Sequence, residues 1–488
     1  MKLIINLSVT VCMLALLAGC TKEAKVWERE KLNDVKLLSF GFYSEDNPLT
    51  LVKNYEVKQV NSNNLIVELP DNVDRSALIA RFTTIDNNVI RVAGAVQKSG
   101  VTANDFSVPV DYILSAGNNN AKYTVTIAKG GDFIWTPVPF TLTDSATAMV
   151  LKVNPVTGIP FIMYTQSRPT AADARAVMAS FEDNKWVDKG AISDGRPGAN
   201  FDFTFNSTGI PYASFLDYDA TVSQSVTVKK FDKVTSSWSL VGNRGLTTTK
   251  VTYNALSFLN DSKLMLFATA DAVGGGLARR EMGVASYENN AWTLNAKVPG
   301  RSSTLSTYLE VAVNMNGAIY LGVVNANSPS SISIYKYANN AWTTILEQWR
   351  DPVATQTHVS DFDIDVDANG NVYAALGDNS NAATYKPRVI KISAANGAVS
   401  SVGSYIQTTN FNFDLALSPQ GVPYLLYRNS SNYPVVVSFD KDSQDWTAPK
   451  VLDMESADNL TFDFAPNGEA YVGYTKNKKL YIHKYTAP

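Results

Sequence analysis

Residues 362–374 read FDIDVDANGNVYA, and this stretch contains the pattern that decides the fold: alternating apolar residues, an Asn-Gly turn and an aromatic second strand. Alternation places the apolar side chains on one face of a strand, and Asn-Gly between two such runs is typical of a β-hairpin. The pattern occurs seven times between Ala148 and the end of the chain. The turns are centred on Gly158, Gly209, Ser262, Gly317, Gly370, Gly421 and Gly468, at spacings of 51, 53, 55, 53, 51 and 47 residues.

Each repeat continues beyond its hairpin with two further strands. The third strand ends in an aromatic or apolar residue, and a short polar turn leads into a fourth strand. In five repeats a tryptophan opens that fourth strand: Trp186, Trp238, Trp292, Trp342 and Trp446. Four strands in a unit of about 50 residues are typical of a propeller blade. We therefore predict an all-β, seven-bladed β-propeller over residues 130–488, with a stacked β-solenoid as the less suitable alternative.

The seventh repeat stops at Tyr485, where its fourth strand should begin. A strand with the missing tryptophan lies upstream of the first repeat, at residues 132–138, and contains Trp135. Unpaired strand edges are a liability, and a propeller avoids them by closing its ring. We therefore expect this N-terminal strand to complete the seventh blade.

The first twenty residues predict export. Lys2 precedes an apolar run from Leu3 to Leu16, and Leu-Ala-Gly-Cys ends at Cys20. This order is typical of a secretory signal peptide, and the run is shorter than the roughly 20 residues that span a bilayer. The four residues resemble a bacterial lipobox, which implies that Cys20 is lipidated and becomes the first mature residue. An ordinary signal peptide with a chance cysteine is the alternative. Residues 21–32 are polar and predict a tether.

Residues 33–129 contain about seven short strands separated by turn residues, which predicts an immunoglobulin-like β-sandwich without a disulfide. The segments 99–102, 104–107 and 123–125 resemble the immunoglobulin-like module at the start of many surface lipoproteins of Bacteroidota. The resemblance implies a spacer between the lipid anchor and a functional domain. It also implies a location at the outer membrane or cell surface.

Composition excludes several classes of protein. The 488 residues carry a net charge of −3 and are 45% hydrophobic, which predicts folded domains with no nucleic-acid role. The two cysteines are Cys12 and Cys20, so no free thiol is expected for zinc or nucleophilic catalysis once Cys12 leaves with the signal peptide and Cys20 carries lipid. Only two histidines are present. We expect neither a metal nor a cofactor.

Loop lengths distinguish the two ends of the predicted ring. The connections from second to third strands and between blades are long, and they share one end, which we call the loop-rich face. Binding residues concentrate on loops that a rigid scaffold holds, and arginine and aromatic side chains suit both glycans and proteins. The predicted ligand-binding residues are Trp349, Arg350, His358, Tyr308, Arg301, Arg244, Tyr218, Tyr385, Arg428 and Tyr433.

These residues have an alternative role, because arginine and tyrosine also cap blades and pair with loop acids such as Asp217, Asp219 and Asp351. A second group of acids recurs beside the apolar positions of the first strands: Asp202, Glu310, Asp363, Asp365, Asp414 and Asp463. Two carboxylates across a cleft could act in glycoside hydrolysis, but hydrogen bonding to neighbouring backbone is the favoured interpretation. The segment 365–370 resembles half of a calcium loop. Leu376 replaces the required glutamate, which favours a simple turn.

The sequence therefore favours a surface lipoprotein that binds a glycan or a protein through the loop-rich face, without catalysis. A carbohydrate-active enzyme, either a glycoside hydrolase or a lyase that uses the first-strand carboxylates, is one alternative. An accessory subunit of an outer-membrane nutrient-uptake complex is another. The expected partners are a glycan or surface protein, the membrane through the lipid anchor alone, and an outer-membrane transporter complex, with no nucleic acid.

Overall fold

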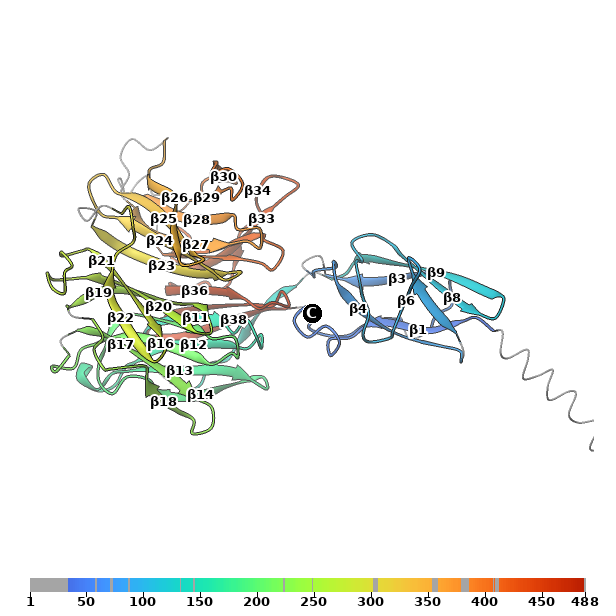
Figure 1. Cartoon of the computed structure of the whole chain (residues 1–488), viewed down its shortest axis with the longest axis horizontal. Helices are drawn as coiled ribbons and strands as arrows, with labels where there is room; N and C mark the ends of the chain where they lie inside the picture. The colour runs from blue at the N-terminus through green and yellow to red at the C-terminus, as the bar shows by residue number, and fades with distance from the viewer. Residues whose placement is uncertain are drawn as a thin grey trace, which may run out of the picture. The chain divides into compact units, whose positions relative to one another are not determined.

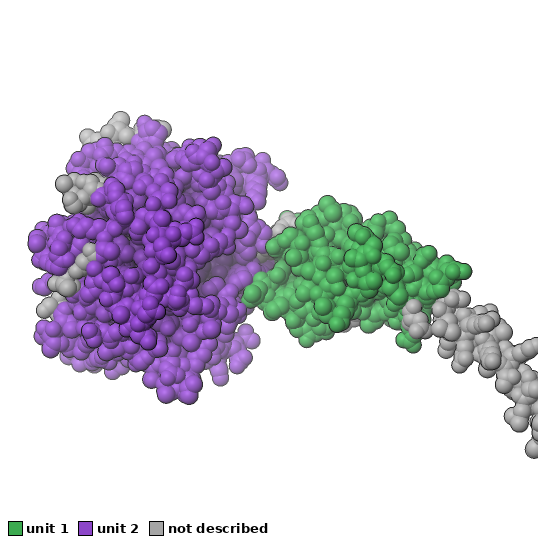
Figure 2. All heavy atoms as spheres, viewed as in Figure 1, with its two compact units in different colours: residues 1–132, 487–488 green, residues 133–486 purple. Residues whose placement is uncertain are grey.

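The computed structural model describes residues 34–486 except 58, 71–72, 87, 132, 144, 223, 248, 302–305, 353–358, 379–385, 407 and 409–411. The predicted signal peptide, Cys20 and the tether lie outside the described residues. The chain divides into two compact units, residues 1–132 with 487–488 and residues 133–486 (Figure 2). Within the described ranges, no helix has the length and apolar character needed to cross a membrane.

The first unit is a two-sheet β-sandwich. One sheet has the order β2-β1-β4-β7 and the other β3-β9-β8-β5-β6, and β3 runs parallel to β9. The strands are β1 (Leu37–Phe42), β2 (Tyr55–Val57), β3 (Asn64–Leu69), β4 (Leu78–Thr84), β5 (Val89–Val92), β6 (Ala95–Val96), β7 (Ala103–Asn104), β8 (Val110–Ala116) and β9 (Asn119–Lys129).

Alternating residues of these strands form the sandwich core. In β3, for example, exposed and buried side chains alternate along the whole strand. Phe40 contacts Tyr112 edge-on at 5.3 Å between ring centroids, and Phe42 contacts Phe106 at 4.8 Å. These buried rings supply large apolar area in a domain that has no disulfide. The immunoglobulin-like sandwich is therefore as predicted, although the described part has more strands than expected.

The second unit is a propeller of four-stranded blades, and the blades follow one another in chain order (Figure 1). Blades one to three comprise β11 (Ala146–Val153), β12 (Pro160–Gln166), β13 (Arg175–Glu182), β14 (Lys185–Ala191), β15 (Pro197–Phe205), β16 (Pro211–Asp217), β17 (Ser225–Asp232), β18 (Ser237–Leu240), β19 (Val251–Asn260), β20 (Lys263–Ala270), β21 (Met282–Glu288) and β22 (Ala291–Ala296). A single 3₁₀ turn, η1 (Ala171–Asp173), lies in the described part of blade one.

Blades four to six continue the order, and in blade six the outer edge is divided between two short strands that both pair with β33. Their strands are β23 (Thr307–Met315), β24 (Ala318–Asn325), β25 (Ser331–Ala338), β26 (Ala341–Trp349), β27 (Val359–Val366), β28 (Val372–Asp378), β29 (Lys386–Ile392), β30 (Val399–Val402), β31 (Phe413–Leu417), β32 (Pro423–Arg428), β33 (Pro434–Asp440), β34 (Asp445–Trp446) and β35 (Lys450–Val451).

The seventh blade closes the ring. It contains β36 (Asp458–Phe464), β37 (Ala470–Lys476) and β38 (Lys479–Thr486), and its outer strand is β10 (Ile134–Val138). β10 pairs antiparallel with β38, with Trp135 opposite Tyr485. The predicted closure by an N-terminal strand is confirmed. It gives the last blade a partner on the edge that would otherwise remain open.

Some of the repeated tryptophans link neighbouring blades. The indole Nε1 of Trp238 donates to the carbonyl of Lys189 at 2.9 Å, and that of Trp292 donates to Val241 at 2.8 Å. Gly242 has φ +82, and a Cβ there would lie 2.6 Å from the Trp292 ring, so glycine is required for this approach. At these two junctions the sequence repeat therefore provides an inter-blade contact as well as a sheet.

Candidate functional site

The predicted ligand-binding residues do not all lie within loops. Trp349 is the last residue of β26, where it pairs with Ile332, and Arg428 is the last residue of β32. Tyr308 lies inside β23, although its side chain is not described. The loop assignment was wrong for these three residues, because strand pairing continues further than the apolar alternation indicates. His358 and Tyr385 lie outside the described residues.

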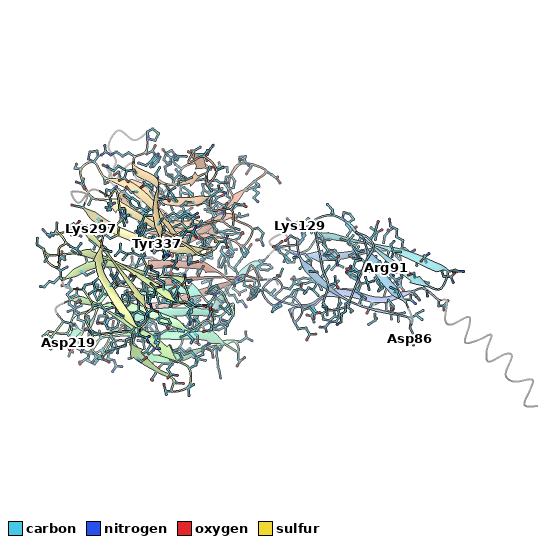
Figure 3. The ribbon with its side chains drawn as sticks, viewed as in Figure 1. Asp86, Arg91, Lys129, Asp219, Lys297 and Tyr337 are labelled. Carbon is cyan, nitrogen blue, oxygen red and sulfur yellow. The ribbon has the colours of Figure 1, made fainter. Side chains whose placement is uncertain are left out.

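Arg244 and Tyr218 follow strands of blade two at its loop-rich end, and Arg244 Nη2 lies 3.3 Å from Asp219 Oδ2 (Figure 3 labels Asp219). Arg244 forms a bidentate ion pair with Asp217, with Nε–Oδ2 at 2.6 Å and Nη2–Oδ1 at 2.9 Å. Asp217 is only 1% exposed, and its hydrogen bonds raise the pKa of Arg244. Arg244 is thus engaged in holding a blade together. Tyr218 is 43% exposed, and the guanidinium of Arg196 lies 5.7 Å from its ring centroid.

Arg428 and Tyr433 belong to blade six. Arg428 Nη1 donates to Asp458 Oδ1 at 2.6 Å and to the carbonyl of Ala457 at 3.1 Å, which ties blade six to the start of blade seven. Tyr433 is half-buried, and its backbone nitrogen donates to Asn429 Oδ1 at 3.0 Å. Arg428 therefore fits the structural alternative that the sequence left open.

Trp349 packs against a cluster of polar groups between blades four and five. The guanidinium of Arg388 lies 6.0 Å from the Trp349 ring and 5.0 Å from the Tyr405 ring. Arg388 also pairs with the buried Asp351, whose Oδ2 accepts from the Tyr405 hydroxyl at 2.8 Å. Burial is the main cause that raises the pKa of Tyr405, and the hydrogen bond to Asp351 raises it further.

Arg388 was missed by the sequence interpretation, which considered only loop residues. A signal was available, because Arg388 shares a strand face with Ile390 and Ile392. A cation on an apolar strand face requires a carboxylate partner. The sequence does not show which acid provides this carboxylate, because Asp351 lies far from Arg388 along the chain.

Arg301 and Arg350 complete the loop-rich end of blade four. Arg301 donates to the Tyr335 hydroxyl at 3.3 Å and to Thr307 Oγ1 at 3.0 Å. Arg350 is exposed and has no hydrogen bond or ion pair in the part of the chain described. The structure thus brings Arg301, Trp349 and Arg350 to one blade, and we call these three residues the blade-four rim.

A cavity of about 980 Å³ runs between the innermost strands of the blades. Its lining includes Lys152, Asp202, Asp363, Asp414 and Asp463, and none of the described ligand-binding candidates contributes to it. Lys152 Nζ lies 2.6 Å from Asp202 Oδ1. The aspartates predicted beside the first-strand apolar positions therefore line a central channel.

Several of these aspartates connect their own blade to a neighbouring one. Asp202 Oδ2 accepts from the backbone nitrogen of Leu256 at 2.8 Å, and Asp363 Oδ2 accepts from Leu415 at 2.8 Å. Asp463 Oδ2 accepts from Val153 at 2.7 Å and so joins the last blade to the first. Burial raises the pKa of Asp463 to about 6 and that of Asp365 to about 7.

Asp363 and Asp414 form a hydrogen-bonded carboxyl pair in the channel. Burial raises the pKa of both groups, and the adjacent Asp363 raises that of Asp414 further. Asp363 accepts from the backbone nitrogens of Ile364 and Leu415, so Asp414 is the member that carries the shared proton. Two like charges in contact cannot both be ionised.

The residues that resemble a calcium loop form a turn. Asp367 Oδ1 accepts from the backbone nitrogens of Asn369 at 3.0 Å and Asn371 at 2.9 Å. Asp367 Oδ2 accepts from the Asn371 side chain at 2.8 Å. Elsewhere in the described residues, no group of three His, Cys, Asp or Glu side chains is arranged to hold a metal ion.

Residues 50–127 match the family model described as SGBP, N-terminal, the N-terminal domain of surface glycan-binding proteins. The match lies within the sandwich and supports a surface glycan-binding protein. No curated protein matches the chain in sequence at a significant level.

Several solved structures are similar to this chain at low identity. A protein of unknown function from Dyadobacter fermentans is 11% identical, with a TM-score of 0.44, over 73% of this chain and 99% of its own. A polysaccharide lyase of family PL25, an ulvan lyase, is 12% identical, with a TM-score of 0.48, over 72% and 96%. The α-L-arabinanase of Penicillium chrysogenum is 10% identical, with a TM-score of 0.44, over 74% and 99%.

Proposed function

We propose that this chain is a lipid-anchored surface protein that binds a glycan at the loop-rich face of its propeller and does not cleave it. The observation that carries the proposal is the match of residues 50–127 to the N-terminal domain of surface glycan-binding proteins. That domain supplies the expected location. The propeller would then supply the ligand site, because its loops present side chains on a rigid ring.

The blade-four rim is the proposed contact surface for the glycan. Arg350 is exposed and has no partner in the described residues, and Trp349 is half-buried with one side toward Arg388. An arginine fork donates to hydroxyl or carboxylate oxygens, and an indole offers a flat apolar surface. By contrast, Arg244 and Arg428 are engaged with Asp217 and Asp458 and would not be available to a ligand.

A glycan-cleaving enzyme is the second candidate, and the Asp363–Asp414 pair is the observation that favours it. Two carboxyls with raised pKa values in a channel could act as acid and base. Against this, both oxygens of Asp363 accept backbone hydrogen bonds, and the one from Leu415 links blades five and six. A carboxylate with these structural duties is poorly suited to exchange protons with a substrate.

The experiment uses protein that begins at Thr21, applied to a glycan array and, in parallel, to a hydrolysis and elimination screen of the same glycans. Binding without turnover supports the proposal. Turnover that Asp414→Asn abolishes would establish the enzyme instead. Failure to bind any glycan, by folded protein, would refute glycan binding and favour an accessory role in a transport complex.

A further inference from the structure

Arg280, at the loop-rich end of blade three, has a guanidinium group for which the described residues provide no partner. Its Nη1 atom is buried and has no hydrogen bond, and no ion pair to this side chain exists within the described residues. Buried donors are almost always paired, because water is lost without replacement. The residue as a whole is half-buried, at the rim of the ring.

The backbone of Arg280 is also unusual. Its φ is +65°, a left-handed conformation that costs energy in residues other than glycine. Two backbone bonds hold it there: Arg280 N donates to Ala270 O at 2.7 Å, and Thr307 N donates to Arg280 O at 2.7 Å. Strain of this kind is concentrated at functional sites.

Thr307 brings a second arginine to the same place. The backbone nitrogen of Thr307 bonds to Arg280, while its hydroxyl accepts from Arg301 Nη2 at 3.0 Å. Arg279 precedes Arg280 and is exposed. The backbone of Arg280 and the side chain of Arg301 are therefore both bonded to Thr307, where blades three and four meet.

The nearby acids do not neutralise these arginines. Glu281 Oε1 pairs with Lys297 Nζ at 2.7 Å (Figure 3 labels Lys297), and Arg301 reaches Glu347 only through the Tyr335 hydroxyl. Asp271 forms no ion pair with Arg279 or Arg280, and Arg279 Nε donates instead to its backbone carbonyl at 3.1 Å. The described part of this surface thus retains an uncompensated positive charge.

We propose that Arg279, Arg280 and Arg301 form a subsite for an oxyanion substituent, a carboxylate or sulfate group, of the bound glycan. The inference rests on the proposed glycan-binding function and specifies its ligand as acidic. Guanidinium groups bind such anions through paired, charge-assisted hydrogen bonds.

The test compares matched probes on the protein that begins at Thr21. Polygalacturonate is measured beside its methyl ester, and chondroitin sulfate beside desulfated chondroitin, together with neutral xylan and β-glucan. We expect at least one acidic probe to bind about tenfold more tightly than its neutralised form, because charged hydrogen bonds are lost. A response to the methyl ester pair identifies carboxylate, and a response to the desulfated pair identifies sulfate.

Variants assign the charge preference to these residues. Arg280→Gly should melt at or above the wild-type temperature, because glycine accepts φ +65°, yet bind the acidic probe about tenfold less tightly. Arg301→Gln should show the same loss of binding. Arg168→Gln is the matched control, since Arg168 is exposed on the loop-rich face of blade one.

The outcomes separate the two proposals. Equal binding of acidic and neutralised probes, binding of neutral glycans alone, or full acidic binding by both variants would overturn the oxyanion subsite and leave glycan binding intact. No binding to any probe or array glycan would overturn glycan binding, and the subsite with it.

Discussion

Trp135 lies opposite Tyr485 across the β10–β38 pair, and its indole stacks on the phenol ring with centroids 4.8 Å apart and planes inclined at 29°. Trp135 also contacts Phe462 edge-on at 5.8 Å. One residue near the start of the propeller thus packs against two residues of its last blade. The contact joins the ends of the ring.

Truncation tests this closure. A chain that lacks residues 21–129 should retain a cooperatively folded propeller, whereas one that lacks residues 21–140 should not, because β38 would lose its partner strand. The measurement is thermal unfolding by circular dichroism. Trp135→Ala in the full chain should cost about 2 kcal/mol, less than for a fully buried tryptophan. Equal melting of both truncated chains would show that β10 is dispensable.

The Asp363–Asp414 pair predicts opposite effects of two similar substitutions. Asp414→Asn should preserve both hydrogen bonds, because the amide nitrogen can donate to Asp363 while the oxygen accepts from Phe462 N. Asp363→Asn should cost about 2 kcal/mol, because one backbone donor then faces an NH₂ group. Thermal unfolding at pH 7 measures both, and a more severe loss in Asp414→Asn would reverse the proton assignment.

The same pair predicts a pH dependence. The folded-state pKa of Asp414 is raised, so wild-type stability from this group is complete below about pH 4 and falls as the pH rises toward the folded-state pKa. Asp414→Asn needs no proton. The melting temperature of Asp414→Asn should therefore rise relative to that of the wild type as the pH increases from 4.5 to 8. A difference that stays constant over this range would show that Asp414 is not protonated in the fold.

Arg244 should matter for stability rather than for binding. Arg244→Ala leaves Asp217 buried with its charge uncompensated, which should cost about 3 kcal/mol of unfolding free energy. Chemical denaturation measures the loss, with Arg168→Ala as the exposed control on the same face. Wild-type stability combined with lost glycan binding would place Arg244 in the ligand site instead.

Substitutions of Arg350 and Trp349, two neighbouring residues of the blade-four rim, should have different effects. Arg350→Ala should weaken glycan binding by about 1.5 kcal/mol or more and leave stability within about 0.5 kcal/mol, because the side chain is exposed and unpaired in the described structure. Trp349→Ala should reduce both, because Trp349 also packs against the core and Arg388. Titration of the array-identified glycan provides the measurement, and Arg91→Ala in the sandwich is the control.

Anchoring has its own test. Cys20→Ala should remove lipid labelling and release the protein from the membrane fraction, because this one residue would carry the lipid. Palmitate labelling and fractionation of cells measure the two effects. Membrane association that persists in the variant would contradict a lipid anchor at Cys20.

The sequence by itself determined the class of fold, the number of blades and the closing strand. These features follow from local periodicity: alternation along residues such as Phe362, Ile364 and Val366, an Asn-Gly turn, and a tryptophan in most of the fourth strands. Trp135 could be identified upstream because its absence from the seventh repeat was visible in the same pattern. Local patterns specify strands and turns directly.

Only the tertiary structure decided which polar residues are partners. Asp363 lies 51 residues from Asp414, and Arg388 lies 37 residues from Asp351, yet each pair is in contact. Arg244 and Arg280 have the same residue type on the same face, but one is neutralised by Asp217 and the other has no partner in the described chain. Such differences depend on which blades meet, because burial and neighbouring charge are set by packing and leave no periodic signal.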